Sequence, residues 1–186
     1  PRWEYPKSKA AAERVIEQEH GDIPYVLLRL AGVYDERSTV PTMAQQMAAV
    51  YERELQSYVF AGDKRAGQAA LHREDMVAAF RLAVDRRADL PLECALLVGE
   101  PETLGYAELQ DELGYLLHGV DDWPTVRLPK PMAQVGVRAL HAIEPVVPDA
   151  IDEGAPTFVK PFMIAMADDH YELDISRARV VLGWEP

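Results

Sequence analysis

The sequence predicts an α/β protein built on a parallel sheet, and two observations support this prediction. Segments with helical and strand-like patterns alternate along the chain, which is typical of α/β folds. Two of the strand-like segments, residues 23–34 and 94–99, are nearly continuous apolar runs. Parallel strands that are covered on both faces have this character. With 48% hydrophobic and 27% charged residues in a chain of 186, the composition suits a globular domain with an apolar core.

The first elements alternate in this way. Residues 6–20 are rich in Ala and Glu and end at Gly21, which predicts a helix with a glycine stop. The apolar run 23–34 follows as a strand expected to be buried on both faces. The next helix is predicted over residues 42–55, and a short strand over 58–61. The apolar residues that repeat at helical spacing in this second helix are Met43, Met47, Val50 and Tyr51.

The second half continues the alternation. A helix is predicted over 72–87, a strand over 94–99 and a helix over 106–118. The apolar side chains expected to face inward from the two helices are Met76, Val77, Phe80, Val84, Leu109, Leu113, Leu116 and Leu117.

Prolines cluster in residues 121–161, so this stretch is expected to be irregular apart from one helix over 132–142. Capping residues at 174–176 open a last helix, which ends at Gly183. We place a domain boundary near residue 120, giving regions 1–120 and 121–186, with a single unit as the alternative. The isolated Trp123 and Trp184 are expected to anchor irregular segments.

Charge and composition exclude several functions. A net charge of −12 without a Lys/Arg cluster argues against nucleic acid or an anionic membrane as a partner. No run reaches the ~20 apolar residues of a membrane span, and no signal peptide is visible, so a cytoplasmic location is expected. The single Cys94 lies in an apolar run and is expected to be a buried thiol. No residues have the spacing of a standard metal site. Because the chain starts at Pro1 beside a catalytic-looking motif, it is expected to be a piece of a longer protein.

The motif that carries chemistry is Tyr5-Pro6-Lys7-Ser8-Lys9. Tyr5 and Lys9 are four residues apart, so a helix places both side chains on one face. An ammonium beside a phenol favours the phenolate and lowers the phenol's pKa from its usual value of about 10. Such a phenol can exchange a proton with a substrate hydroxyl or carbonyl oxygen as a general acid or base. A chance Tyr-x-x-x-Lys is expected about 0.2 times in a chain of this composition, so the spacing gains weight only with its context.

Four segments in order supply that context. They are Tyr5 to Glu13, Leu28 to Tyr34, Leu71 to Val77, and Leu173 to Pro186 with its closing Gly-Trp-Glu-Pro. Together they resemble the active-site helix, the following strand, the Val-His-Val-Asp-Asp segment and the Gly-Trp-x-Pro ending of extended short-chain dehydrogenases/reductases, the NAD-dependent epimerase/dehydratase family. The resemblance implies the C-terminal part of a Rossmann-type doubly wound parallel sheet plus a small, mostly helical substrate-binding region.

The resemblance also implies roles for individual residues. Tyr5 would transfer the proton to or from the substrate, and Lys9 would lower the pKa of Tyr5. Both residues would contact the cofactor, NAD or NADP, with Lys9 bound to its ribose. The nicotinamide side would be lined by Leu30, Ala31, Gly32 and Val33. Substrate contacts would come from Tyr34, Arg37 and His72, and the substrate would be a small molecule with a hydroxyl or carbonyl group.

The family's Gly-rich phosphate loop is absent from this sequence, so the fragment alone is expected to bind cofactor poorly. Two further departures concern the substrate. Asp35-Glu36 stand where relatives read Gly-Pro, and Gly67 to Leu71 lack the Arg-Asp pair that grips nucleotide diphosphates. Nucleotide sugars are therefore less expected, although Lys64, Arg65 or Arg73 could replace the missing guanidinium.

Two functions remain open. The parent could be an NAD(P)-dependent oxidoreductase, epimerase or dehydratase, or a non-catalytic protein that senses nucleotide or scaffolds a partner. In either case unpaired parallel strands leave open sheet edges, so a homo-oligomer is expected. The sequence leaves the substrate, the choice between NAD and NADP, and the reaction within the family undetermined.

Overall fold

The computed structural model describes residues 4–143 and 159–186. The chain divides into two compact units, each made of segments that are distant in sequence. Unit 1 comprises Pro1–Glu36, Ala70–Pro101 and Leu173–Pro186, and unit 2 comprises Arg37–Ala69 and Glu102–Glu172. This division differs from the anticipated boundary near residue 120, because the C-terminal segment returns to unit 1. In the described part of the chain, every helix is too short or too polar to cross a membrane.

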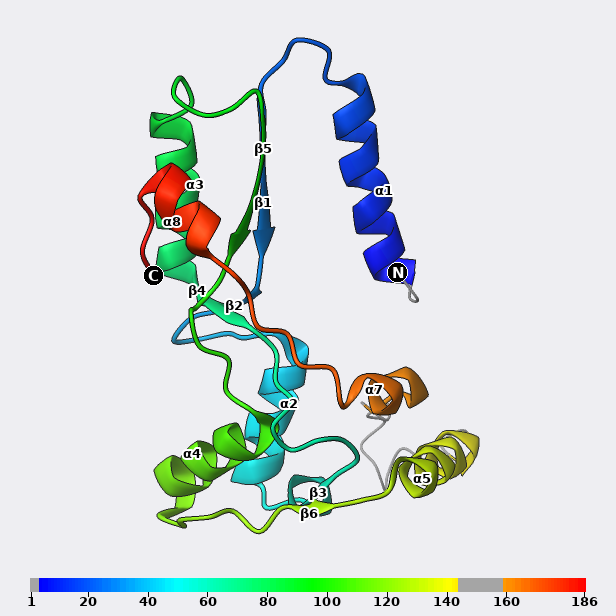
Figure 1. Ribbon diagram of the computed structural model, residues 1–186. Helices are drawn as coiled ribbons and strands as arrows, with labels where there is room; N and C mark the ends of the chain where they lie inside the picture. Colours follow the sequence, from blue (N-terminus) through cyan, green and yellow to red (C-terminus); the bar gives the residue numbers. More distant parts are fainter. Residues whose placement is uncertain (1–3, 144–158) are drawn as a thin grey trace. The chain divides into compact units, whose positions relative to one another are not determined.

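Unit 1 is an α/β unit with parallel strand pairs, as the sequence predicts (Figure 1). β1 pairs with β5 from Tyr25↔Glu93 to Leu30↔Val98, and β2 pairs with β4 from Gly32↔Ala70 to Tyr34↔His72. The elements of unit 1 are α1 (Glu4–Glu19), β1 (Tyr25–Leu30), β2 (Gly32–Tyr34), β4 (Ala70–His72), α3 (Arg73–Asp85), β5 (Glu93–Val98) and α8 (Ser176–Leu182).

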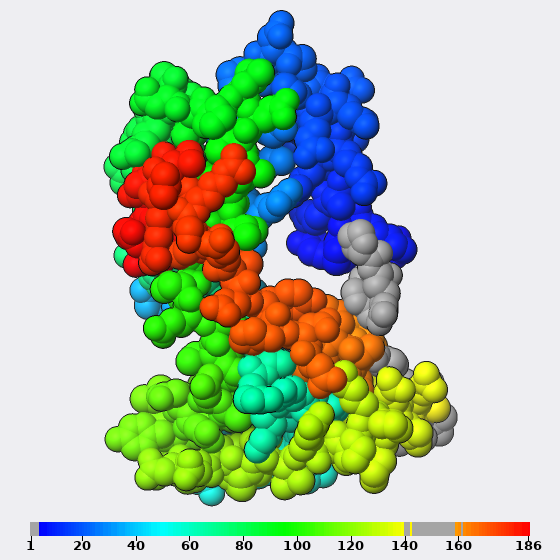
Figure 2. All heavy atoms as spheres, viewed as in Figure 1, coloured from blue at the N-terminus to red at the C-terminus, as the bar shows by residue number. Residues whose placement is uncertain are grey.

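The core of unit 1 lies between β5, α3 and α8. Cys94, Leu96 and Val98 alternate along β5 and are buried, which confirms the expected buried thiol. The C-terminal segment (red in Figure 2) covers α3, and its Trp184 is only 1% exposed. The Trp184 indole N–H donates to the Asp75 carbonyl oxygen over 2.9 Å. The expected anchoring role of this tryptophan is therefore confirmed.

Two packing expectations for unit 1 are wrong. The strand over 23–34 is not buried on both faces, since the residues of β1 are half-buried or exposed. The helix α1 does not cover it tightly, because no residue of α1 is buried. The expected strand is also interrupted at Ala31, which divides it into β1 and β2. On α3 the buried residues are Ala79 and Ala83, whose small side chains allow close packing. The larger side chains expected to face inward are instead substantially exposed, and these are Val77, Phe80 and Val84.

Unit 2 is mostly helical, as expected, with one short parallel pair, β3 and β6. One apolar cluster joins α5 and α7 through Ala133, Val137 and Ile164. A second joins α2 and α4 through Val50, Leu113 and Trp123. The elements of unit 2 are α2 (Pro41–Tyr51), the 3-10 helix η1 (Leu55–Tyr58), β3 (Val59–Phe60), α4 (Tyr106–His118), β6 (Val126–Arg127), α5 (Lys130–Ile143) and α7 (Pro161–Met166).

Trp123 anchors the connection after α4, as predicted. It is 5% exposed, and its indole N–H donates to the Ser57 carbonyl oxygen over 3.1 Å. Its ring packs so closely on Gly114 that a Cβ there would lie 2.6 Å from a ring carbon. This contact turns the Leu113–Gly114 side of α4 inward and leaves Leu116 and Leu117 outside, contrary to expectation.

The structure also differs from the sequence predictions in α2 and in several short elements. Met47 and Tyr51 of α2 are exposed, whereas Ala49 and Val50 are buried. The short elements β4, β6 and α7 were not predicted. Much of the proline-rich stretch, residues 144–158, lies outside the described residues.

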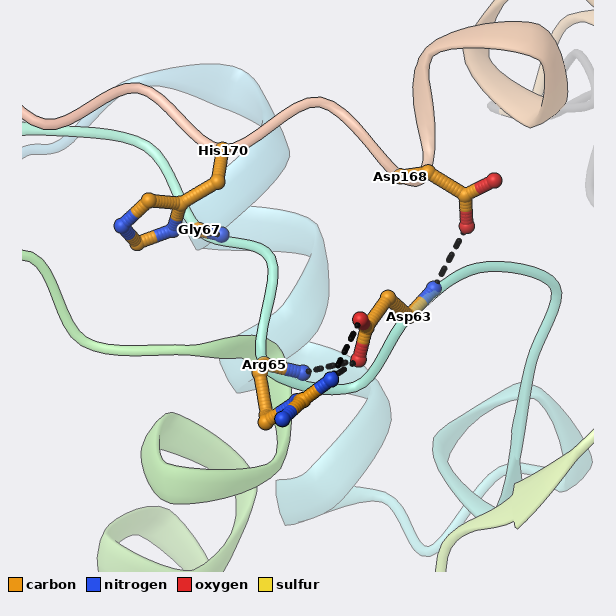
Figure 3. Close-up of polar contacts among 5 residues, drawn as sticks. All are labelled: Asp63, Arg65, Gly67, Asp168 and His170. Carbon is orange, nitrogen blue, oxygen red and sulfur yellow. Dashed lines mark hydrogen bonds and ion pairs between the residues drawn. The ribbon is translucent and has the colours of Figure 1, made fainter.

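A polar network in unit 2 fixes the loop from Asp63 to Gly67 (Figure 3). The Asp63 backbone N–H donates to Asp168 over 2.7 Å, and the Gly67 N–H donates to His170 Nδ1 over 3.2 Å. Within the loop, Arg65 donates from its backbone and its guanidinium to Asp63. Asp168 also pairs with Lys130, at 2.6 Å, and the hydrogen bond from that ammonium lowers the pKa of Asp168. The network therefore binds two distant segments of unit 2 to each other.

Gly67→Ala should destabilise this loop. A Cβ at Gly67 would lie 1.9 Å from the Leu104 carbonyl oxygen, so the backbone would have to move. We expect a loss of about 1–3 kcal/mol in the free energy of unfolding, measured by urea denaturation. Gly136→Ala is the control, since nothing lies within 4 Å of its Cβ and the residue is helical. That change should stabilise the protein by up to about 1 kcal/mol. If the two substitutions changed the free energy of unfolding equally, the close approach of Gly67 to the Leu104 carbonyl oxygen would be contradicted.

Candidate active site

Tyr5 and Lys9 lie side by side in the first turns of α1. The helix forms where the sequence is rich in Ala, and Ser8 Oγ donates to the Tyr5 carbonyl oxygen over 2.8 Å. The Lys9 ammonium lies 5.4 Å from the centre of the Tyr5 ring. The Tyr5 side chain is 72% exposed, so its hydroxyl is accessible and is not packed in an apolar interior. The structure thus brings the two predicted residues together on an open face.

The position of Tyr5 along unit 1 follows from a link between α1 and β1. Glu13 and Arg29 form hydrogen bonds, the shortest of 2.6 Å, and these lower the pKa of the Glu13 carboxyl. The two elements run in opposite directions (Figure 1). Tyr5 lies about 12 Å before Glu13 along the helix, and Val33 lies about 13 Å beyond Arg29 along the extended chain. Both residues are therefore displaced from the link toward the same end of unit 1.

That end is the carboxyl end of the parallel strands, where ligands of open α/β sheets bind. The Ala31 N–H donates to the Val98 carbonyl oxygen over 2.9 Å, which brings the ends of β1 and β5 together. Gly99 fits tightly here, since a Cβ would lie 3.0 Å from the Ala31 Cβ. Leu30, Ala31, Gly32 and Val33 are half-buried or exposed. Small residues toward the same end of unit 1 as an accessible phenol could hold the nicotinamide end of a dinucleotide, whereas the loop for its pyrophosphate is absent from this sequence.

A second group of polar side chains lies where β2 and β4 end. Tyr34 and His72 are register partners, and their rings meet edge to face with centres 5.3 Å apart. The Tyr34 hydroxyl donates to Glu100 over 2.6 Å, and His72 Nε2 lies 3.5 Å from Glu36 Oε1. His72 occupies the N-cap position of α3 without a capping hydrogen bond from its side chain. The structure thus joins two of the three predicted substrate residues in one cluster.

Arg37, the third predicted substrate residue, is exposed and opens unit 2. Glu100 is not among the residues predicted from the sequence, although its place just after a predicted strand was the available signal. The pairing of Arg73 with Asp35, at 2.7 Å, is not predicted either. Among the described residues, no group of three His, Cys, Asp or Glu side chains could hold a metal ion.

The Tyr34 hydroxyl should titrate unusually late. Its hydrogen bond to Glu100, followed by burial, raises its pKa to about 12. Because the folded-state pKa exceeds the unfolded value, the contribution to stability is present below about pH 10 and is lost as the pH rises toward 12. An ultraviolet titration of the phenolates should show a late component that is smaller in Tyr34→Phe. Tyr106, whose pKa burial also raises to about 12, should keep its late titration in that variant. An unchanged late component would contradict the Tyr34–Glu100 bond.

The comparisons with known proteins agree with this architecture. No family model matches the sequence, and no curated protein matches it. Solved structures do match. The UDP-glucuronic acid 4-epimerase from Bacillus cereus, in complex with UDP-glucuronic acid and NAD, has a TM-score of 0.63 at 16% identity, over 98% of this chain and 47% of its own. The dTDP-glucose 4,6-dehydratase from Bacillus anthracis, in complex with NAD, has a TM-score of 0.62 at 14% identity, over 100% and 48%.

A third structure, the UDP-glucose 4-epimerase from Thermotoga maritima with UDP-glucose, has a TM-score of 0.56 at 20% identity, over 97% of this chain and 46% of its own. The chain thus spans about half the length of the solved structures that it matches. Its fold is that of one part of Rossmann-type epimerases and dehydratases of the extended short-chain dehydrogenase kind. The resemblance expected from the four sequence segments is confirmed at the level of the fold.

Proposed function

We propose that this chain forms the catalytic part of an NAD(P)-dependent oxidoreductase, epimerase or dehydratase whose nucleotide-binding loop lies outside the sequence. The observation that carries the proposal is the pairing of Tyr5 with Lys9 on an exposed face, toward the carboxyl end of the parallel strands. The structural neighbours are NAD-dependent epimerases and dehydratases, which supports the same class. The fragment by itself is expected to be inactive.

In this proposal Tyr5 exchanges a proton with the substrate oxygen, and the Lys9 ammonium lies beside the Tyr5 ring. Lys9 also binds the ribose of the cofactor. Leu30, Ala31 and Gly32 would hold the nicotinamide ring, which supplies hydride chemistry when the cofactor is bound. Tyr34 and His72 would orient a small substrate with a hydroxyl or carbonyl group.

Lys9→Met in the intact enzyme tests this division of roles. The change removes the ammonium that acts on both the phenol and the ribose, so turnover and NAD(P)H affinity should both fall. Affinity is measured by the fluorescence of the bound reduced cofactor. The matched control is Lys7→Met, because Lys7 lies on the same helix, has neither proposed role, and pairs with Glu4, at 2.7 Å. A Lys9 variant that keeps both properties would contradict the proposal and favour the non-catalytic alternative.

Two further expectations remain proposals. Self-association through open strand edges and exposed apolar side chains is testable by analytical ultracentrifugation, where a monomer at all concentrations would contradict it. A cytoplasmic location is testable by cell fractionation.

A further inference from the structure

His20 lies between α1 and the strands of unit 1. Its backbone N–H donates to the Ile16 carbonyl oxygen over 3.0 Å, so it closes the last turn of α1 before Gly21 turns the chain at a φ of 57°. The His20 side chain is only 11% exposed, and its ring meets the Tyr25 ring of β1 edge to face, with centres 4.9 Å apart. The imidazole is therefore largely buried where the helix is joined to the strands.

Both ring nitrogens of His20 face oxygen atoms that accept hydrogen bonds. Nδ1 lies 3.1 Å from the Ile23 carbonyl oxygen, and Nε2 lies 3.3 Å from Glu93 Oε1, at the start of β5. Neither a carbonyl nor a carboxylate has a hydrogen to donate. A neutral imidazole carries one N–H and donates to one of these oxygens, whereas the protonated ring carries two and donates to both. The geometry therefore suits the protonated ring.

The surrounding charges favour the protonated ring as well. His20 closes the C-terminal turn of α1, where the free carbonyl groups of a helix stabilise a positive charge. Burial, followed by the charges of nearby glutamates, raises the pKa of the Tyr25 hydroxyl, which shows that this corner of unit 1 is acidic. Arg29 on β1 pairs with Glu13, at 2.6 Å, and so offsets part of this charge. The carboxylates near His20 in space or in sequence are those of Glu13, Glu17, Glu19, Asp22 and Glu93.

The attachment of α1 relies on polar contacts of this kind, because no residue of the helix is buried. The Glu13–Arg29 pair attaches its middle to β1, and the contacts of His20 attach its end to β1 and β5. Loss of the proton from the ring removes one of the two hydrogen bonds and the attraction to Glu93. The attachment should therefore weaken as the pH rises through the range in which histidines titrate.

We propose that His20 is a pH-dependent latch, which in its protonated form holds the end of α1 to β5 through Glu93 and which loosens when the ring loses its proton. The stabilisation is present at about pH 5.5 and is lost as the pH rises toward about 8, because the protonated ring alone bonds to both oxygens. The inference goes beyond the proposed function. It concerns how firmly the helix that carries Tyr5 and Lys9 is attached, and not the chemistry of those residues.

The test is hydrogen exchange of the backbone amides of α1 in the 186-residue chain, measured by mass spectrometry. Protection factors are used, since they correct for the intrinsic effect of pH on exchange. Those of α1 should fall about two- to fivefold between about pH 5.5 and 8, the effect expected of a partly exposed ion pair. The reference is α8, which reports on the core of unit 1. The fall in α1 should exceed any fall in α8.

His20→Gln and Glu93→Gln should each abolish the pH dependence of α1 protection, because either change removes the ion pair. The Glu93 side chain is 60% exposed, so Glu93→Gln keeps the test open if His20→Gln fails to fold. The matched control is His72→Gln, which should retain the dependence, because His72 also faces a glutamate, Glu36, at 3.5 Å. Wild-type protection that falls no more in α1 than in α8 would overturn the latch, and so would a dependence that survives in Glu93→Gln.

Discussion

Tyr5→Phe in the intact enzyme is expected to lower turnover by about 10²- to 10⁴-fold, the usual contribution of a positioned acid or base. The change removes one hydroxyl, which is the proposed proton donor and acceptor. The aromatic ring beside the Lys9 ammonium remains, so the first turns of α1 should keep their structure. Cofactor affinity should therefore be unchanged.

The assay uses a panel of small hydroxy compounds and follows formation of reduced nicotinamide for a net oxidation, or conversion of the substrate for an epimerisation or dehydration, in which the cofactor is regenerated. Tyr51→Phe is the matched control, because Tyr51 is similarly exposed, at 64%, and lies in unit 2. That variant should retain wild-type turnover. If Tyr5→Phe also retained it, the acid/base role of Tyr5 would be wrong, and the likeness to epimerases and dehydratases would extend to the fold alone.

Trp184→Ala should have the largest effect on stability, with a loss of about 3–5 kcal/mol in the free energy of unfolding. The indole is 1% exposed and joins the C-terminal segment to α3, where its N–H donates to Asp75. Truncation would leave a cavity among the apolar residues that hold α8 against α3 and β5. Urea denaturation followed by circular dichroism measures the change.

Val180→Ala is the control for this prediction. Val180 lies on α8 in the same segment but is 82% exposed, so its truncation should change stability by no more than about 0.5 kcal/mol. Trp184→Phe should fall between the two, because it keeps most of the apolar contact and loses the hydrogen bond. Similar stabilities for Trp184→Ala and wild type would mean that the C-terminal segment is not part of the core of unit 1.

The sequence predicted the bounds of helices and strands better than it predicted which faces of the helices are buried. The helix over 106–118 and the strand over 94–99 were located within a residue, because periodicity and glycine stops are local signals. Which face of a helix is buried depends on its neighbours. The contacts of Gly114 with Trp123, and the small Ala79 and Ala83, decide the orientation of α4 and α3. A short strand such as β4 is stabilised mainly by pairing with its partner strand, here β2, so its own residues give little sequence signal for a strand.

In the candidate site, too, contacts between residues close in sequence were predicted and contacts between distant residues were not. Tyr5 and Lys9 were found because one helical turn determines their proximity, and the structure places them together. The Tyr34–Glu100 and Asp35–Arg73 contacts join residues 66 and 38 positions apart in the sequence. No local pattern predicts such pairs. They follow from the parallel register of β2 and β4 and from the end of β5 beside them.

The most direct test is a crystal structure of the intact enzyme with NAD. The account predicts that Lys9 binds the nicotinamide ribose, that the Tyr5 hydroxyl faces the reactive carbon of the ring, and that the ring lies against Ala31 and Gly32. A nicotinamide bound away from α1, or a Tyr5 side chain turned from it, would contradict the proposed catalytic role.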